Sequence, residues 1–207
     1  MRKYLLPAAI CLATLSASPA TAYTSGFYIT PKYIYTQQRI KKAHTWVNDI
    51  RGVDGEAGRG QNEGGALAFG YDAIVLRYEL EVALRGRYKE GQATLETNSV
   101  FVNFYHDFRN HTVFTPYLSA GAGFSSTRFK IYNSAFTEAD RSNSFAWNVG
   151  IGAICNIFRN EIDLDIGYRF VDYGKAKFSR DIPGGNHLRV EGRQTGTEII
   201  VGLKYHL

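Results

Sequence analysis

The chain is poor in cysteine, since Cys11 and Cys155 are the two thiols among 207 residues. Cys11 lies in an apolar amino-terminal segment that we expect to be removed, which leaves Cys155 alone. A single thiol cannot form an internal disulfide, so the sequence excludes the disulfide-stapled class of small exported domains. Its stability must come from the burial of side chains or from a membrane.

Long apolar runs are absent after residue 22, so the sequence predicts no transmembrane helix. Residues 1–22 have the parts of a secretory signal: a basic start, an apolar core too short to span a bilayer comfortably, and the small-residue site Ala20-Thr21-Ala22. We therefore predict a cleaved signal peptide over residues 1–22 and a mature domain over residues 23–207. An uncleaved anchor is the alternative. A lipoprotein signal at Cys11 is disfavoured because Ile10 precedes it, where a small residue is expected.

A strong excess of charge is also absent. The formal net charge is +5, and Arg2 and Lys3 of the expected signal supply two of those charges. A mildly basic balance does not indicate a nucleic-acid partner. Aromatic residues and glycine are plentiful, with 14 Tyr, 13 Phe and 21 Gly. In an exported chain without a spanning helix, this composition favours β structure.

Apolar and polar residues alternate along most of the chain. From Leu76 to Tyr88, for example, each apolar residue is followed by a charged or small one. This period of two is typical of strands. We predict eight strands, over residues 25–40, 64–72, 75–88, 98–108, 114–130, 144–157, 161–173 and 194–207.

The predicted connections alternate in length. Short turns are expected at residues 72–74, 109–111 and 159–160, and long polar loops at residues 41–63, 90–98, 133–143 and 174–193. Short turns on one side and long loops on the other are typical of outer-membrane barrels, with the turns in the periplasm. The predicted fold is an all-β, eight-stranded antiparallel up-and-down transmembrane β-barrel.

Alternation alone does not say which row faces inward, and a secreted lipocalin-type barrel would place its charges outside. Two observations favour the membrane barrel. The polar row carries many glycines, which suit a narrow interior. The apolar row carries aromatic residues towards its ends, as expected of interfacial girdles: Tyr88, Phe108, Phe124, Phe145, Phe170 and Tyr205.

The polar row would then lie in the lumen. Its mixed charges should form ion pairs, because a buried charge is costly unless it is compensated. We expect a plug of ion pairs and water rather than a wide channel. The predicted lumen charges are Arg77, Glu79, Glu81, Arg85, Arg87, Asp107, Asp163, Asp165, Arg169, Glu198 and Lys204.

Several segments resemble a known family. TPYLSAGAGFS, LDIGYRFVDYG, GGALAFGYD and VGLKYH are similar to the small eight-stranded outer-membrane surface proteins of Gram-negative bacteria, which include the opacity proteins and the barrel of outer membrane protein A. The resemblance implies a place in the outer membrane among lipids and lipopolysaccharide, and insertion by the barrel-assembly machinery. Such chains usually end in Phe, whereas this one ends in Leu207, with Tyr205 two positions earlier.

The resemblance leaves the activity open between an adhesin-like surface antigen, a narrow pore and a structural protein of the envelope. We favour the surface antigen, acting on host surface molecules or lipopolysaccharide through its loops. The candidate loop contacts are Lys41, Lys42, Trp46, Lys175, Lys177 and Arg180. Solvated loops without a ligand are the simpler alternative.

Catalytic and metal motifs are not evident. Asp163 and Asp165 share one strand face, but partners for nearby arginines explain them better than a cation does. The five histidines lack metal-ligand spacing, and none begins the His-x-Ser pair of barrel deacylases. The sequence therefore predicts no enzyme, no metal and no cofactor.

Overall fold

The computed structural model describes the backbone of residues 25–47, 50–51, 55–86, 88–90, 93–110, 112–133, 136–158, 161–182 and 186–207. Side chains are described for residues 25–39, 60–86, 96–110, 112–128, 141–157, 161–175 and 192–207. The predicted signal peptide over residues 1–22 lies outside the described residues and remains a prediction.

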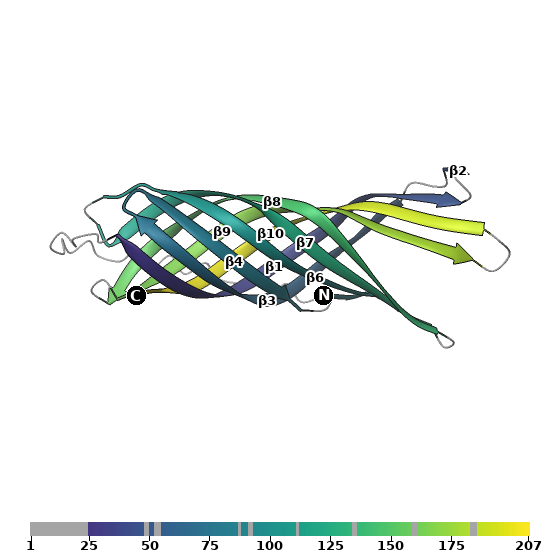
Figure 1. The fold of residues 1–207 in the computed structure, drawn as a ribbon, viewed down its shortest axis with the longest axis horizontal. Coiled ribbons are helices and arrows are strands. Elements are labelled where there is room, and N and C mark those ends of the chain that lie inside the picture. The colour runs from purple at the N-terminus through teal and green to yellow at the C-terminus, as the bar shows by residue number, and fades with distance from the viewer. Residues whose placement is uncertain are drawn as a thin grey trace, which may run out of the picture.

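Eight long antiparallel strands form a closed barrel within the described residues (Figure 1). Each strand pairs with the next along the chain, and β10 pairs with β1 to close the sheet. This confirms the predicted fold, and closure leaves no unpaired edge for lipid to meet. The barrel strands are β1 (Gly26–Val47), β3 (Gly55–Ala73), β4 (Leu76–Arg85), β6 (Ala93–Asp107), β7 (Phe114–Asn133), β8 (Phe136–Phe158), β9 (Ile162–Ile182) and β10 (Asn186–His206).

Two short strands complete the sheet. β2 (Ile50–Arg51) pairs with β1, and β5 (Tyr88–Glu90) pairs with β6. The part of the chain that the structure describes contains no helix long and apolar enough to cross a membrane.

The three short connections, β3–β4, β6–β7 and β8–β9, lie at one end of the barrel, which we call the short-turn end. In the first of them Ile74 adopts a φ of 72°, a left-handed conformation that β-branched residues rarely adopt. Its amide donates to Asp72 Oδ1 at 3.1 Å. The three short turns at this end were predicted correctly, because few residues separate the alternating segments there.

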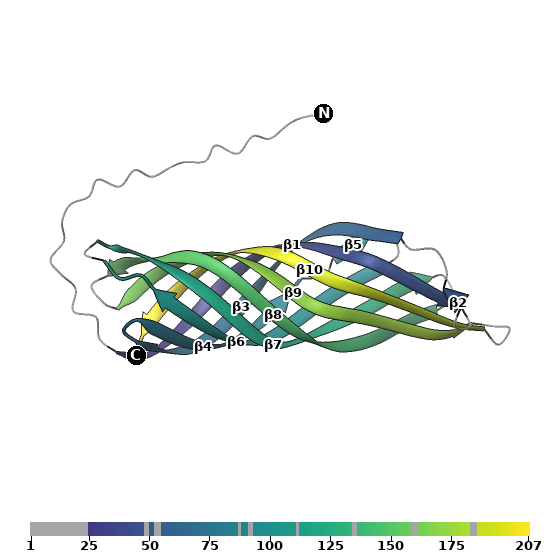
Figure 2. The same ribbon diagram turned by 90° about the horizontal axis from the view of Figure 1, so that it is seen from above.

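The opposite end, which we call the hairpin end, differs from the prediction. The segments expected to be long loops are largely strand: β9 and β10 pair as far as Ile182 and Asn186, and β7 and β8 as far as Asn133 and Phe136. These hairpins project beyond the barrel in both views (Figures 1 and 2). A hairpin that has left the membrane needs no apolar face, so its sequence shows little of the alternation on which the strand prediction rested.

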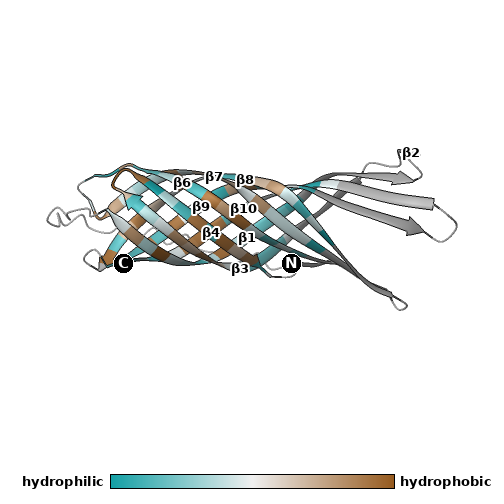
Figure 3. Cartoon of the chain, viewed as in Figure 1, coloured by the Kyte–Doolittle hydropathy of each residue, from teal (hydrophilic) through white to brown (hydrophobic). Residues whose placement is uncertain are grey.

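The two faces of the barrel have the polarity expected in a membrane. Figure 3 shows hydrophobic and hydrophilic residues alternating along the strands of the barrel. Outward side chains such as Leu80 and Ile166 are 50% and 45% exposed, whereas Glu81 and Arg77 inside are 0% exposed. A soluble lipocalin-type barrel has its apolar side chains inside and its charges outside. The prediction of a membrane barrel is therefore the correct one.

Glycine makes room for paired side chains at the centre of the barrel. A Cβ at Gly121 would lie 2.0 Å from Asn103 Oδ1 and 2.6 Å from Asn148 Nδ2, two atoms that hydrogen-bond at 3.0 Å. A side chain here would have to break this bond, and interior positions in a narrow barrel tolerate little added volume.

Replacing Gly121 with leucine should therefore lower the free energy of unfolding by about 1–3 kcal/mol, as overpacking does. Urea titration of refolded protein in vesicles measures this difference. The matched control is Ala120→Leu, because Ala120 is exposed on the outer face of the same strand. Equal stability of the two variants would contradict the arrangement described here.

Candidate functional site: the barrel interior and its rim

The barrel interior contains the predicted lumen charges, with the exception of Arg87, which lies outside the described residues. All the others are at most 6% exposed. They come from four strands that close around one axis, so side chains distant in sequence meet at hydrogen-bond distance. The buried charges are Arg77, Glu79, Glu81, Arg85, Asp107, Asp163, Asp165, Arg169, Glu198 and Lys204.

In the part of the interior nearer the hairpin end, the Glu198 carboxylate accepts hydrogen bonds from several buried side chains. Its Oε1 accepts hydrogen bonds from Arg85 Nε at 2.8 Å and from the Tyr173 hydroxyl at 2.6 Å. Its Oε2 accepts from Arg169 Nε at 2.5 Å. One carboxylate thus faces two guanidinium groups, and both of its oxygens are occupied.

The network continues across the barrel through alternating charges. Arg169 also donates to Glu81 at 2.7 Å, and Glu81 accepts from Lys32 Nζ at 2.9 Å. Lys32 pairs in turn with Glu79, to which the Tyr105 hydroxyl donates at 2.8 Å. Each charge of this network therefore has an opposite charge beside it, which is the condition for holding charges away from bulk water.

A second group of charges lies towards the short-turn end. Arg77 Nε donates to both oxygens of Asp107, at 3.0 and 2.8 Å. Its guanidinium lies over the rings of Tyr105 and Tyr117, with the carbon 4.3 and 5.0 Å from the centroids, as in cation–π contacts. Nearby, Asp72 accepts from Lys204 Nζ at 2.8 Å.

Asp163 and Asp165, for which we expected arginine partners, have other contacts. Asp163 accepts from Asn156 at 2.8 Å and lies 2.9 Å from His206 Nε2. Asp165 accepts from the Tyr117 hydroxyl at 2.7 Å. In the part of the chain that the structure describes, no group of three His, Cys, Asp or Glu residues is placed to hold a metal ion.

Uncharged side chains occupy the interior above the ion pairs, towards the hairpins. Gln194 Nε2 donates to Gln38 Oε1 at 3.1 Å and to Thr97 Oγ1 at 3.0 Å. The Thr127 hydroxyl donates to Gln194 Oε1 at 3.2 Å. These side chains from four strands form a hydrogen-bonded layer between the charges and the hairpin end.

Little free volume remains beside the central ion pairs. A cavity lined by Lys32, Tyr117, Asp165 and Arg169, among others, has a volume of about 10 Å³. That is about the space that one water molecule needs. This level of the interior is therefore filled by side chains.

Sequence reasoning missed several members of the network, including Lys32, Asp72 and the interior tyrosines Tyr105, Tyr117 and Tyr173. Lys32 was detectable, because Thr30, Lys32 and Thr36 alternate with apolar or aromatic neighbours on β1. The tyrosines were not, because a tyrosine counts as apolar in an alternating pattern although its hydroxyl can bind a carboxylate inside.

The predicted girdle aromatics lie on the outer face, where they are described. Phe108 and Tyr205, near the short-turn end, are 46% and 48% exposed. Phe124 and Phe145, nearer the hairpins, are 67% and 61% exposed. Phe170 is half-buried, with its ring 5.7 Å from that of Trp147. The side chain of Tyr88 lies outside the described residues, and the interfacial role of the whole set remains a prediction.

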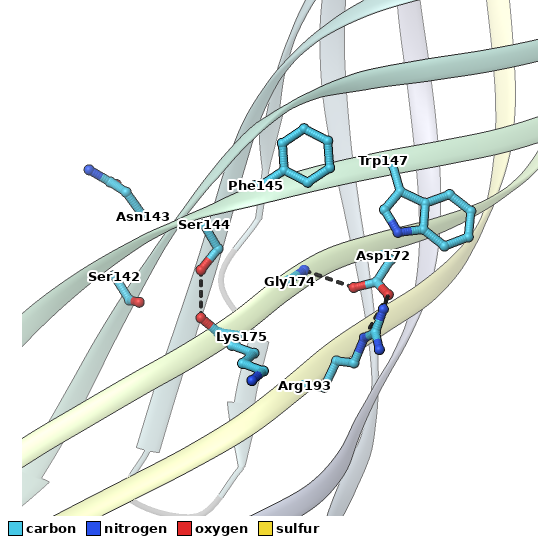
Figure 4. Close-up of a pocket in the computed structure, with 9 residues that line it drawn as sticks. All are labelled: Ser142, Asn143, Ser144, Phe145, Trp147, Asp172, Gly174, Lys175 and Arg193. Carbon is cyan, nitrogen blue, oxygen red and sulfur yellow. Dashed lines mark hydrogen bonds and ion pairs between the residues drawn. The ribbon is translucent and has the colours of Figure 1, made fainter.

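Of the predicted loop contacts, the structure describes the side chain of Lys175 alone. It lies in a pocket of about 500 Å³ between β8, β9 and β10 (Figure 4). Phe145 and Trp147 line one part of this pocket, and Lys175, Asp172 and Arg193 another. We call it the rim pocket. The side chains of Lys41, Lys42, Trp46, Lys177 and Arg180 lie outside the described residues.

Comparisons with known proteins agree with this architecture. The family model described as "Outer membrane protein beta-barrel domain" matches residues 8–206. Outer membrane protein PagN of Salmonella typhimurium is 27% identical over 244 residues, covering 95% of this chain and 97% of PagN.

Two solved structures share the fold. OprG of Pseudomonas aeruginosa superposes with a TM-score of 0.68 at 16% identity, covering 91% of this chain and 100% of OprG. Neisserial surface protein A gives a TM-score of 0.55 at 18% identity, covering 86% of this chain and 99% of that protein. With the family match over nearly the whole chain, the protein belongs to the outer membrane protein beta-barrel domain family and resides in the bacterial outer membrane.

Proposed function

We propose that this outer-membrane barrel is a non-enzymatic, adhesin-like surface antigen that acts through the hairpins at its hairpin end. The observation that carries this proposal is the pairing of β1 with β3, and of β9 with β10, well beyond the ion-paired part of the barrel. Paired hairpins offer a more ordered surface to a partner than flexible loops, because less conformational entropy is lost on binding.

The filled interior supports this choice over a narrow pore. Ion pairs join strands across the lumen, for example Arg169 of β9 to Glu81 of β4. The space beside them holds about one water molecule. An ion would have to displace these paired charges to pass.

The composition of the hairpins indicates the kind of partner. The β1–β3 hairpin contains Lys41, Lys42 and Trp46, and the β9–β10 hairpin contains Lys177 and Arg180. Basic residues beside an aromatic favour acidic partners such as sulfated glycans or acidic host proteins. The β7–β8 hairpin differs at its tip, where the acidic residues Glu138 and Asp140 outnumber the basic residue Lys130.

Shortening the β1–β3 and β9–β10 hairpins should abolish binding to host cells while the barrel stays folded. In one cut an Asn-Gly turn joins Ile40 to Ala57. In the other cut the turn joins Ala176 to Gly192, which removes Lys177 and Arg180. Both pairs are cross-strand partners, so the register is kept. Cell binding of bacteria that express each variant measures the effect, and the heat-dependent gel shift of the barrel reports folding.

The β7–β8 hairpin supplies the matched control. Joining Arg128 to Arg141, which are also cross-strand partners, removes an acidic tip and should leave cell binding unchanged. If bacteria with the β1–β3 and β9–β10 hairpins both shortened bind cells as well as the parent does, the proposed function is wrong.

A further inference from the structure

The rim pocket lies on the outer face of the barrel, where the apolar band meets the hairpins. Trp147 of β8 and Asp172 of β9 are cross-strand partners, as are Lys175 of β9 and Arg193 of β10. Asp172 follows Ile166, Tyr168 and Phe170 in the outward row of β9. The pocket therefore joins a lipid-facing surface to a charged one.

An irregularity in the sheet builds the charged part of the pocket. The register between β9 and β10 shifts at Gln194 and Thr195, and Gly174 opposite has a φ of 84°. The Gly174 amide donates to Asp172 Oδ1 at 2.9 Å, and Arg193 Nε donates to Asp172 Oδ2 at 2.7 Å. The bulge thus keeps Asp172 buried and fixes one edge of the Arg193 guanidinium (Figure 4).

The remaining charge of the pocket is positive. Asp172 is 3% exposed, so solvent meets the two cations rather than the carboxylate. The side chain of Arg193 is 58% exposed even though it is paired, and Lys175 is exposed. Arg39, exposed on β1, is a cross-strand partner of Thr195 and adds a third cation close by.

We propose that the rim pocket binds the phosphorylated headgroup of an outer-leaflet lipopolysaccharide. Lys175 and Arg193 contact the phosphate, and Phe145 and Trp147 contact the first part of the acyl chains. Charge complementarity supports the phosphate, because ammonium and guanidinium groups form strong charge-assisted hydrogen bonds with it. Continuity with the apolar band supports a lipid over a soluble ligand, because acyl chains already lie against that band.

Trp147 provides a direct reporter of this site. The chain has two tryptophans, so Trp46→Phe leaves Trp147 as the single one. In this background, refolded protein in phosphatidylcholine vesicles is titrated with diphosphoryl lipid A, and the emission of Trp147 is followed. We expect a saturable change. Lys175→Gln should weaken the apparent affinity about tenfold, the loss of one charge-assisted contact.

Arg193 is tested without leaving the Asp172 carboxylate unpaired. The double variant Asp172→Asn with Arg193→Gln removes the second cation and should also weaken the affinity about tenfold. The matched control is Arg128→Gln, since Arg128 lies at the same end of the barrel on β7 and does not line the pocket. Its affinity should equal that of the parent. The gel shift of each variant verifies that the barrel has folded.

Three results would overturn the proposal. An unchanged Trp147 emission on addition of lipid A would show that nothing binds in the pocket. An equal loss of affinity in the Lys175 and Arg128 variants would mean that lipid A senses only the general surface charge. Saturation by inorganic phosphate at the same concentrations as lipid A would assign the site to a free anion rather than to a lipid.

Discussion

Replacing Glu198 with leucine should lower the free energy of unfolding by about 3–5 kcal/mol, the cost of leaving buried charges without their partner. Arg85 and Arg169 both donate to this carboxylate, and the substitution removes it from both guanidinium groups, although Arg169 keeps its contact with Glu81. Tyr173 also loses its acceptor. The effect is measured by urea titration of the barrel in vesicles, with the heat-dependent gel shift as the readout of folding.

Two further variants define the cause of this loss. Glu198→Gln should destabilise the barrel less, because the amide oxygen still accepts a hydrogen bond although the negative charge is gone. Thr197→Leu is the matched control, since Thr197 precedes Glu198 on β10 and lies on its outer face, half-buried. An unfolding free energy for Glu198→Leu that is equal to that of Thr197→Leu would show that the ion pairs do not hold the interior together.

Replacing Ile166 with lysine should prevent stable insertion into bilayers. Ile166 lies on the outer face of β9 between Ala153 of β8 and Val201 of β10, and its side chain is 45% exposed. A lysine at the bilayer midplane costs a transmembrane barrel about 2–4 kcal/mol. The fraction of folded protein after dilution from urea into vesicles, measured by the gel shift, reports the result.

The neighbouring residue provides the comparison for this substitution. Asp165 points inward, where the Tyr117 hydroxyl donates to it at 2.7 Å. In Asp165→Asn the side-chain oxygen can still accept this bond, so folding should be close to that of the parent. If Ile166→Lys folds into vesicles with the same yield as Asp165→Asn, the outer face of β9 does not contact lipid.

The strands of the barrel were predictable because each has one apolar and one polar face. In β4 the burial of side chains alternates at every residue from Leu76 to Arg85, as the sequence pattern indicates. The hairpins were not predictable in this way. Outside the membrane no face of a strand has to be apolar, so pairing between β9 and β10 continues past Lys175 without a periodic signal.

The interior was predictable in its composition but not in its pairing. The pattern places Glu81 and Arg169 in the lumen, yet their contact depends on the relative shift of strands across the barrel. The rim pocket was even harder to predict from the sequence. Asp172 belongs to the outward, apolar row by its position, and the bulge at Gly174 that covers it leaves no mark in the alternation.

The seam between β1 and β10 determines when the barrel can be completed. Its pairs run from Tyr28 with His206 to Val47 with Leu188, so they join segments from opposite ends of the described chain. Closing so large a loop carries an entropic cost before any of these contacts form, and topologies of this kind fold slowly. The Thr36–Glu198 hydrogen bond spans the same seam, so the Glu198 carboxylate can contact Thr36, and Arg85 across the lumen, only when the barrel closes. Until then the interior charges are open to water, so the slow step of folding precedes their burial.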